Sequence, residues 1–234
     1  RGREFAQMSR RLLGDLLDRN DDHVASLDPD AFAAQRDGQR PPVVSVCCSD
    51  SRVPQAGMWS ATDLGYLFTA GNIGNRVTAV VNGNTVLSGS VAYPLCHTDT
   101  DVVAVVGHTG CGAVGAALDA ARTGAFPADP GVRSDVEDLL PIVERGLDEA
   151  VSGSVGASVR NQLVEYNVHE QVAFATESDA AGDADVYGFV YDFHGVYGDR
   201  DGATYLVNAD GTRDPDRLRS LVDDAHTDRV VTLL

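Results

Sequence analysis

The 234-residue sequence contains no lysine, so all 18 of its basic residues are arginines. It also lacks any uncharged apolar stretch of the roughly 18 residues that a membrane-spanning helix needs, which predicts a soluble protein. The four cysteines are too few and too irregularly spaced for a disulfide framework in a chain of this length. Metal binding or burial in the core therefore explains them better.

The first ten residues, RGREFAQMSR, lack the apolar segment of a secretory signal peptide. The missing initiator methionine leaves a removed leader open, but the residues present predict a cytoplasmic protein. With 43% hydrophobic and 23% charged residues, and with no internal repeat or low-complexity linker, the chain has the composition of one folded unit with a substantial core.

Acidic residues outnumber basic ones by 35 to 18, which gives a formal net charge of -17. Arginine in place of lysine, together with this acidic excess, is typical of a salt-adapted surface from a halophile. Molar salt shortens the Debye length to about 3 Å and so screens repulsion between carboxylates. An ordinary acidic protein is the alternative. In either case a surface of this sign disfavours nucleic acids and anionic membranes as partners.

Strand and helix patterns alternate along the chain. Short apolar and β-branched runs predict strands over residues 41–48, 63–71, 101–108, 185–195 and 203–211. Amphipathic and small-residue patterns predict helices over residues 9–20, 84–97, 109–122, 134–180 with a break near 152–156, and 215–224. Alternation of this kind is typical of proteins in which helices cover a mostly parallel sheet.

The fold class that follows is α/β, with a mostly parallel sheet of about five strands flanked by helices. The central four strands are expected to run parallel, and the last two are close enough in the chain to form a hairpin, which makes one edge antiparallel. Leucines at helical spacing near the N-terminus predict a helical arm whose apolar stripe needs a partner. We expect a single domain over residues 1–234, with the arm in residues 1–40 and the α/β core in residues 41–234.

Two of the predicted strands end in residues that bind metals. Cys48 closes the first strand, and His108 closes the third, three residues before Cys111. Parallel sheets bind ligands beyond the carboxyl ends of their strands, so these side chains converge if the two strands are neighbours. Two thiolates and one imidazole form a Cys₂His zinc site with an open fourth position, which is typical of catalytic zinc.

Adjacent residues of an extended chain point to opposite faces, so only one of Cys47 and Cys48 can bind the metal. Cys48 shares its parity with Asp50 and Arg52, which assigns it to the site, whereas Cys47 and Cys96 are interpreted as buried apolar residues. Asp50 and Arg52 suit a charge-assisted pair. A loop-fixing salt bridge is the alternative for this pair, and unrelated burial is the alternative for the three metal-binding residues.

These segments resemble the β-class carbonic anhydrases. CSDSRVP from Cys48 matches the Cys-x-Asp-x-Arg signature of that family, and GHTGCGAV from Gly107 matches its His-x-x-Cys signature. AGNIGN, NVHEQV and GFVYDFHG match further segments in the same order. The resemblance covers most of the chain, from about Gln39 to Val207.

The resemblance implies carbonate dehydratase activity, the reversible hydration of carbon dioxide to bicarbonate and a proton by attack of zinc hydroxide. It implies one Zn²⁺ per subunit, bound by Cys48, His108 and Cys111, and a dyad of Asp50 and Arg52 that orients the hydroxide. The implied substrate-binding residues are Gln39, Phe68, Tyr93 and Gly112. Because the family lines this pocket across a dimer interface, we also expect a homodimer, which can pair into a tetramer.

Three alternatives stay open at this point. Asp50 either orients the hydroxide or swings onto the zinc and closes the site; Gln39, a marker of the readily active subgroup, favours the first state. Hydrolases of carbon disulfide and carbonyl sulfide resemble the same family, and no feature of this sequence signals their narrower tunnel. A non-catalytic protein with structural zinc would need Asp50 or Cys47 as a fourth ligand.

Overall fold

The computed structural model describes residues 2–33, 35–151 and 157–234. The chain divides into two compact units, Arg1–Gln39 and Arg40–Leu234. No helix within the described ranges is long and apolar enough to cross a membrane. The sheet and all three predicted metal ligands lie in the second unit.

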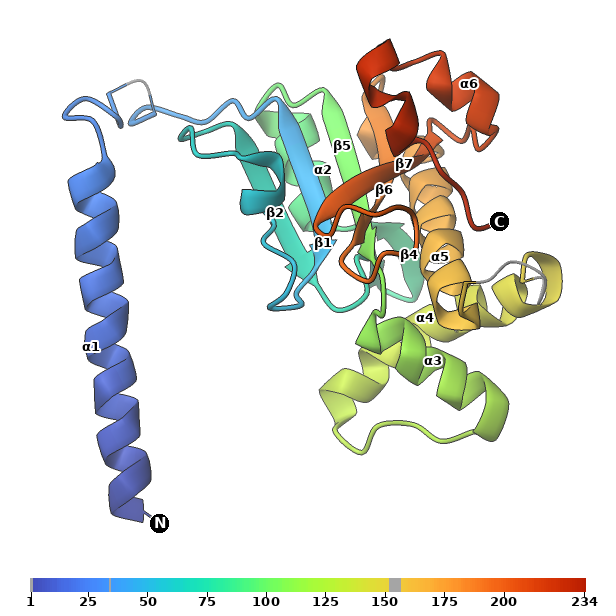
Figure 1. The fold of residues 1–234 in the computed structure, drawn as a ribbon, viewed down its shortest axis with the longest axis horizontal. Helices are drawn as coiled ribbons and strands as arrows, with labels where there is room; N and C mark the ends of the chain where they lie inside the picture. Colours follow the sequence, from blue (N-terminus) through green and yellow to red (C-terminus); the bar gives the residue numbers. More distant parts are fainter. Residues whose placement is uncertain (1, 34, 152–156) are drawn as a thin grey trace. The chain divides into compact units, whose positions relative to one another are not determined.

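The first unit is dominated by helix α1 (Gly2–Ser26), blue in Figure 1. The helix is longer at both ends than the predicted span of residues 9–20, because no proline interrupts the chain before Pro29. The predicted apolar stripe is present and lies uncovered within this unit, with 58–64% of each side chain exposed at Leu12, Leu13, Leu16 and Leu17.

The second unit is built on a five-stranded sheet (Figure 1). In spatial order its strands are β2 (Leu67–Asn72), β1 (Val43–Cys48), β5 (Val102–His108), β6 (Asp185–Asp192) and β7 (Ala203–Ala209). β1 pairs in parallel with β2 and β5, and β5 pairs in parallel with β6. β7 runs antiparallel along β6. The predicted α/β fold with one antiparallel edge is confirmed.

Helices pack against this sheet and against one another. They are α2 (Gly89–His97), α3 (Gly112–Thr123), α4 (Pro130–Glu149), α5 (Val159–Thr176) and α6 (Pro215–Arg219). Short 3-10 turns span Gly57–Trp59, Asp179–Ala181 and Asp224–Arg229. α5 is the central helix, because it contacts β5, β6, α3 and α4.

Two glycines in the sheet let α5 approach it closely. A Cβ atom at Gly107 of β5 would lie 2.7 Å from Cγ2 of Val168, and one at Gly188 of β6 would lie 2.7 Å from Cγ1 of the same side chain. Both distances are shorter than real carbon contacts, so any larger residue would push the helix away. Val168 is fully buried in this seam, which fixes α5 relative to β5 and β6.

The predicted helix over residues 84–97 is wrong in its first part. Asn84–Leu87 form strand β4, which pairs antiparallel with β3 (Thr78–Val81), and α2 begins only at Gly89. The turn between the strands consists of Asn82 and Gly83, with φ angles of 51° and 81°. Positive φ at both positions is what a two-residue hairpin turn requires, and Asn-Gly is its strongest sequence signal.

Other boundaries shift by a few residues. α6 ends at Arg219, five residues before the end of the predicted helical span of residues 215–224, and a 3-10 turn begins only at Asp224. The predicted break near residues 152–156 lies outside the described residues; α4 ends before it and α5 begins after it. β6 ends at Asp192 rather than at residue 195, because the buried Asp192 carboxylate accepts hydrogen bonds from the backbone of the following turn.

Candidate metal centre

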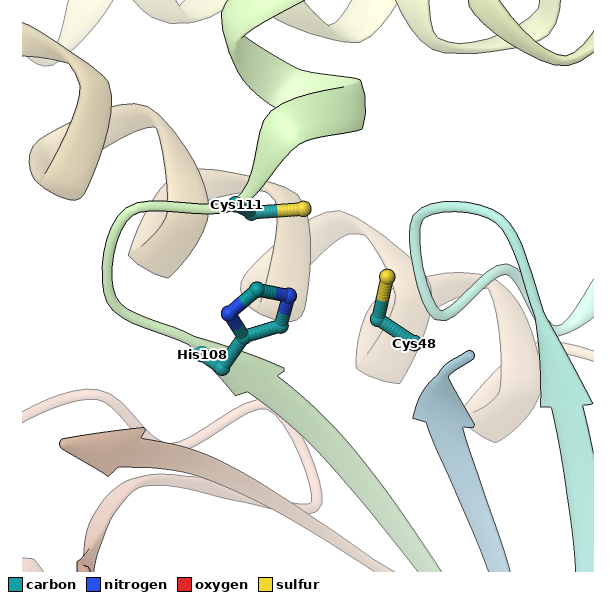
Figure 2. A group of neighbouring side chains, drawn as sticks. All are labelled: Cys48, His108 and Cys111. Atoms are coloured by element: carbon teal, nitrogen blue, oxygen red, sulfur yellow. The ribbon is translucent and has the colours of Figure 1, made fainter. Parts of the chain in front are cut away.

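The three predicted metal ligands meet beyond the carboxyl ends of two neighbouring strands. Cys48 is the last residue of β1 and His108 the last of β5, and these strands are parallel neighbours. Cys111 immediately precedes α3, so the chain turns back toward the strand ends. Figure 2 shows the three side chains pointing toward one another, and their ligand atoms all lie within 4.8 Å of each other. The expected convergence is confirmed.

The imidazole of His108 is oriented for metal binding through Nε2. Its side chain is fully buried, and Nδ1 lies 3.1 Å from the carbonyl oxygen of Thr109. A carbonyl only accepts, so Nδ1 carries the proton and the lone pair is on Nε2. In the part of the chain that the structure describes, Nε2 has no hydrogen-bond partner. A buried, unsatisfied acceptor is costly unless a ligand uses it.

The two ligand thiols interact directly. A hydrogen bond from Cys111 lowers the pKa of Cys48 to about 4 against the cost of burial, and the neighbouring His108 and the backbone N–H of Gly74 act in the same direction. The same bond to Cys48, followed by burial, raises the pKa of Cys111. Backbone N–H groups of the first turn of α3 act on Cys111 in the opposite direction. The pair thus already stabilises one thiolate without a metal.

This donor set fits a zinc ion. Nitrogen and sulfur are the ligand atoms that zinc prefers, and bonds of about 2.0–2.3 Å in a tetrahedron place ligand atoms about 3.3–3.8 Å apart. The observed upper limit of 4.8 Å requires only small side-chain shifts. The unsatisfied Nε2 of His108 supplies the independent evidence that a cation belongs here. Among the described residues, Cys48, His108 and Cys111 form the one such group.

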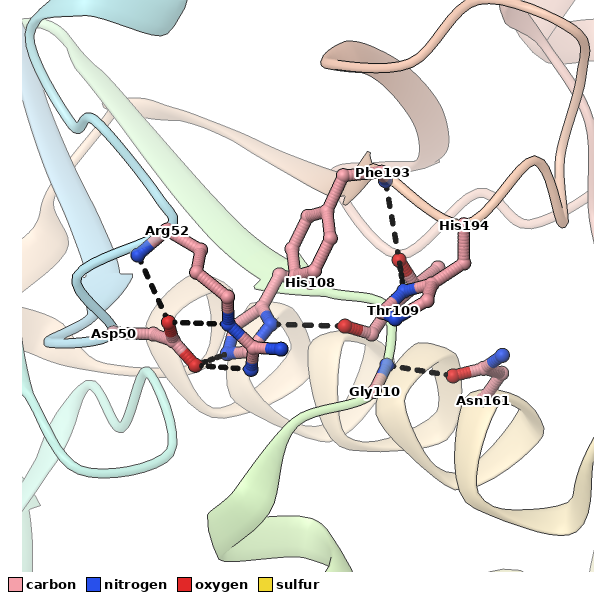
Figure 3. Close-up of polar contacts among 8 residues, drawn as sticks. All are labelled: Asp50, Arg52, His108, Thr109, Gly110, Asn161, Phe193 and His194. Carbon is pink, nitrogen blue, oxygen red and sulfur yellow. Dashed lines mark hydrogen bonds and ion pairs between the residues drawn. The ribbon is translucent and has the colours of Figure 1, made fainter.

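Asp50 and Arg52 form a pair beside this cluster (Figure 3). Nε and Nη2 of Arg52 donate to the two carboxylate oxygens of Asp50 at 2.9 and 2.7 Å, and the Arg52 backbone N–H donates to Oδ1 at 2.9 Å. These bonds hold the pKa of Asp50 well below its usual range. Asp50 Oδ2 also lies 3.7 Å from Nε2 of His108, so the carboxylate stands next to the ligand atoms.

A sequence profile for carbonic anhydrase matches residues 43–197, which include the ligand cluster and the pair beside it. The chain belongs to the carbonic anhydrase family. Among related proteins, carbonic anhydrase 2 of Mycobacterium tuberculosis is 31% identical over 144 residues, 62% of this chain and 63% of the relative. The carbonic anhydrase of Pseudomonas aeruginosa is 30% identical over 158 residues, 66% of this chain and 70% of the relative. The match thus spans less than two thirds of the Mycobacterium protein.

Solved carbonic anhydrase structures share the fold. The β-carbonic anhydrase CafA of Aspergillus fumigatus superposes with a TM-score of 0.65 at 23% identity, over 89% of this chain and 95% of that one. The Coccomyxa β-carbonic anhydrase gives 0.64 at 22% identity, over 89% and 90% of the two chains. The resemblance stated from the signature segments is confirmed by the family profile, and the solved β-class structures show that the fold is shared.

Two asparagines of α5 hold the loops of this candidate metal centre. Oδ1 of Asn161 accepts the backbone N–H of Gly110, between two ligands, at 2.8 Å. Nδ2 of Asn167 donates at 3.1 Å to the carbonyl of Gly74, whose N–H contacts the Cys48 sulfur. Asn167 lies in the NVHEQV segment that matched the family, but its contact could not be inferred there. Nothing in the sequence singled out Asn161.

A second set of contacts comes from the turn after β6. The Thr109 hydroxyl lies 2.9 Å from Nδ1 of His194 and accepts the backbone N–H of Phe193 at 3.3 Å (Figure 3). The same hydroxyl donates to Asp192 Oδ1 at 3.1 Å. The Phe193 ring stacks on the His108 ring, with centroids 5.9 Å apart. The sequence placed Asp192, Phe193 and His194 in a family segment, GFVYDFHG, without indicating that they reach the loop of the metal ligands.

The predicted substrate-binding residues are only partly brought together. Phe68 and Tyr93 are in contact, with ring centroids 6.1 Å apart, and Tyr93 is 49% exposed. Gly112 is exposed at the first position of α3, directly after a ligand. Gln39 is exposed at the end of the first unit, so its role in substrate binding stays a prediction, as do those of the other three.

The two cysteines outside the cluster, Cys47 and Cys96, differ in burial. Cys47 is fully buried, as predicted, and burial raises the pKa of its thiol to about 12. The prediction that Cys96 is buried is wrong, because it lies on the outward side of α2, where its sulfur contacts the Ala180 carbonyl at 3.6 Å. α2 is short and mostly apolar, so its sequence did not distinguish the buried side of the helix from the exposed side.

Proposed function

We propose that this protein catalyses the reversible hydration of carbon dioxide to bicarbonate and a proton, with one zinc ion per subunit held by Cys48, His108 and Cys111. The observation that carries the proposal is the buried Cys-His-Cys cluster with an arginine-held carboxylate at its side. Membership of the carbonic anhydrase family supports the same reaction. When bound, the zinc ion supplies a Lewis acid that lowers the pKa of a water molecule.

The residues of this chain then orient and confine the reactants. Asp50 accepts a hydrogen bond from the reacting water, which directs an oxygen lone pair toward carbon dioxide. Arg52 keeps Asp50 ionised and in place. Phe68 and Tyr93 offer an apolar wall to carbon dioxide, and the backbone N–H of Gly112 and the side chain of Gln39 contact the substrate oxygens.

We further propose that Asp50 stays off the metal in the resting protein. Both of its oxygens are engaged by Arg52, and it is not part of the group of three ligand atoms that lie within 4.8 Å of one another. A structural zinc site would need a fourth protein ligand. The arrangement therefore supports a catalytic site in which the fourth position is open to solvent.

The proposal includes self-association as a homodimer, which can pair into a tetramer, with residues 1–40 as an arm of a single domain over residues 1–234. The uncovered leucines of α1 support it, because an apolar stripe of this size needs a partner. Two β-carbonic anhydrases of Sordaria macrospora are tetrameric, and one superposes with a TM-score of 0.64. Light scattering is expected to give at least twice the mass of one chain; an active monomer would contradict the proposal.

We also propose a cytoplasmic protein adapted to high salt, on the grounds of its net charge of -17 and its lack of lysine. Its unfolding temperature is expected to rise steeply as KCl increases to molar concentrations, because screening relieves repulsion between carboxylates. A midpoint independent of KCl would contradict salt adaptation.

Metal analysis combined with stopped-flow carbon dioxide hydration tests the main proposal. We expect about one zinc ion per chain and turnover that disappears when a chelator removes the metal. The same preparation is assayed with carbon disulfide and carbonyl sulfide. Zinc without hydration of carbon dioxide, or turnover of only the sulfur compounds, would overturn the proposed reaction.

A further inference from the structure

The ring of Phe193 lies next to both functional parts of the site (Figure 3). The guanidinium carbon of Arg52 stands 4.9 Å from the ring centroid. The same ring stacks on His108, with centroids 5.9 Å apart and an angle of 18° between the planes. One aromatic side chain therefore contacts both the arginine of the dyad and a metal ligand.

We propose that Phe193 is a positioning residue that holds Arg52 on Asp50 and so keeps Asp50 out of the metal-binding group. The inference rests on the proposed function, since it assigns Asp50 a role in turnover. Phe193 belongs neither to the three metal ligands nor to the Asp50–Arg52 dyad.

Arg52 needs support beyond its partner. Its side chain is 51% exposed, and an exposed ion pair contributes little by itself because solvent screens it and the long side chain loses rotamer freedom. The guanidinium lies over the face of the Phe193 ring, within the range of a cation–π contact. The ring thus restricts the arginine to the position from which it reaches both oxygens of Asp50.

The ring can do this because its backbone is fixed. Asp192, 1% exposed, accepts the backbone N–H groups of Val196 and Tyr197, both at 2.7 Å. The N–H of Phe193 itself donates to the Thr109 hydroxyl at 3.3 Å. The turn after β6 is therefore tied both to its own carboxylate and to the loop that carries the ligands.

Loss of the Phe193 ring is expected to release Arg52 and, with it, Asp50. A released Arg52 frees the carboxylate of Asp50, whose Oδ2 is already 3.7 Å from Nε2 of His108. The carboxylate can then turn toward the metal position and compete with the reacting water. Fewer molecules are competent at any moment, so kcat falls while KM for carbon dioxide and metal content do not change.

The test compares Phe193→Leu, which removes the aromatic face, with Phe193→Tyr, which keeps it. We expect Phe193→Leu to lower kcat about two- to fivefold, the factor associated with a partly exposed cation–π contact, and Phe193→Tyr to restore it. Zinc per chain is expected to be unchanged in both. In the metal-free protein, the NMR signal of the Arg52 Nε–H is expected to lose its ring-current shift in the leucine variant only.

The matched control is Phe126→Leu, because the Phe126 ring lies 4.8 Å beneath the guanidinium of Arg133, elsewhere in the fold. It is expected to leave kcat and the Arg52 signal unchanged. In an Arg52→Ala background, Phe193→Leu is expected to cause no further loss. Full activity of Phe193→Leu, an equal loss in the Arg52→Ala background or an unmoved Arg52 signal would overturn the inference. An inactive wild type would instead overturn the proposed function, and the NMR comparison would still test the contact.

Discussion

The side-chain oxygen of Asn161 accepts the backbone N–H of Gly110 at 2.8 Å, and so joins the first turn of α5 to the loop between His108 and Cys111. Asn161 is only 8% exposed, so this bond is shielded from solvent. Backbone groups next to metal ligands determine ligand orientation even though they do not touch the ion. The metal centre is thus supported by a helix that begins about 50 residues further along the chain.

Replacement of Asn161 tests this support. Asn161→Leu is expected to lower zinc affinity about 10- to 100-fold, the range found when outer partners of metal ligands are removed. Competition with a chromogenic zinc chelator measures the change. Asn84→Leu, at an exposed position of β4, is the control and should bind zinc like the wild type. Unchanged affinity of Asn161→Leu would show that the loop holds its shape alone.

Gly110 is expected to tolerate no side chain. Its φ is +68°, and a Cβ atom would lie 2.7 Å from Cε1 of His194. Gly124, with φ +72° and open space around it, is the matched control. Gly124→Ala should cost about 1–2 kcal/mol from left-handed strain alone, whereas Gly110→Ala should cost more, because the collision is added. Thermal unfolding measures both, and equal losses would contradict the predicted clash.

The ligand cysteines are expected to be indispensable for the metal. Cys48→Ala or Cys111→Ala removes one of three protein ligands, so purified protein should contain little zinc and show no turnover. Cys96→Ala is the control, because that thiol is exposed and outside the cluster. Elemental analysis gives the zinc content. A full complement of zinc in Cys48→Ala would disprove the ligand assignment.

Asp50 is expected to be required for turnover but not for metal binding. Asp50→Ala should retain zinc and lose activity about 100-fold, as expected for a group that accepts and orients a reacting proton. Asp216→Ala removes a carboxylate that is also paired with an arginine, in the exposed Asp216–Arg219 pair, and should behave like the wild type. Stopped-flow hydration assays give the rates. Normal turnover of Asp50→Ala would remove the role given to this residue.

Removal of zinc is expected to destabilise the fold. An ion present at a hundred times its dissociation constant stabilises the native state by about 2.7 kcal/mol, which corresponds to about 5–10 °C for a chain of this size. Unfolding temperature with and without a chelator measures the effect. Cys48→Ala, lacking a ligand, should not respond to the chelator; an equal response would point to a metal bound elsewhere.

Much of the fold was predictable because the strands of a buried parallel sheet are continuous apolar runs. β1 and β5 were predicted nearly at their observed ends for this reason. The β3–β4 hairpin was missed although Asn82-Gly83 signals it. Each strand has only four residues and β4 directly precedes α2, so the strand period of two residues could not be separated from the helical period of 3.6. The exposure of Cys96 was also missed, because a nine-residue helix of small residues has no clear polar side.

The sequence by itself determined the ligand types, their places at strand ends and the pairing of Asp50 with Arg52, since these depend on neighbouring residues and on strand parity. Only the tertiary structure decided that β1 and β5 are neighbours, that α5 supplies Asn161 and that Phe193 reaches Arg52. The physical reason is that such contacts arise from strand order and helix packing. These bring together segments far apart in the chain, and local hydrophobic periodicity carries no record of them.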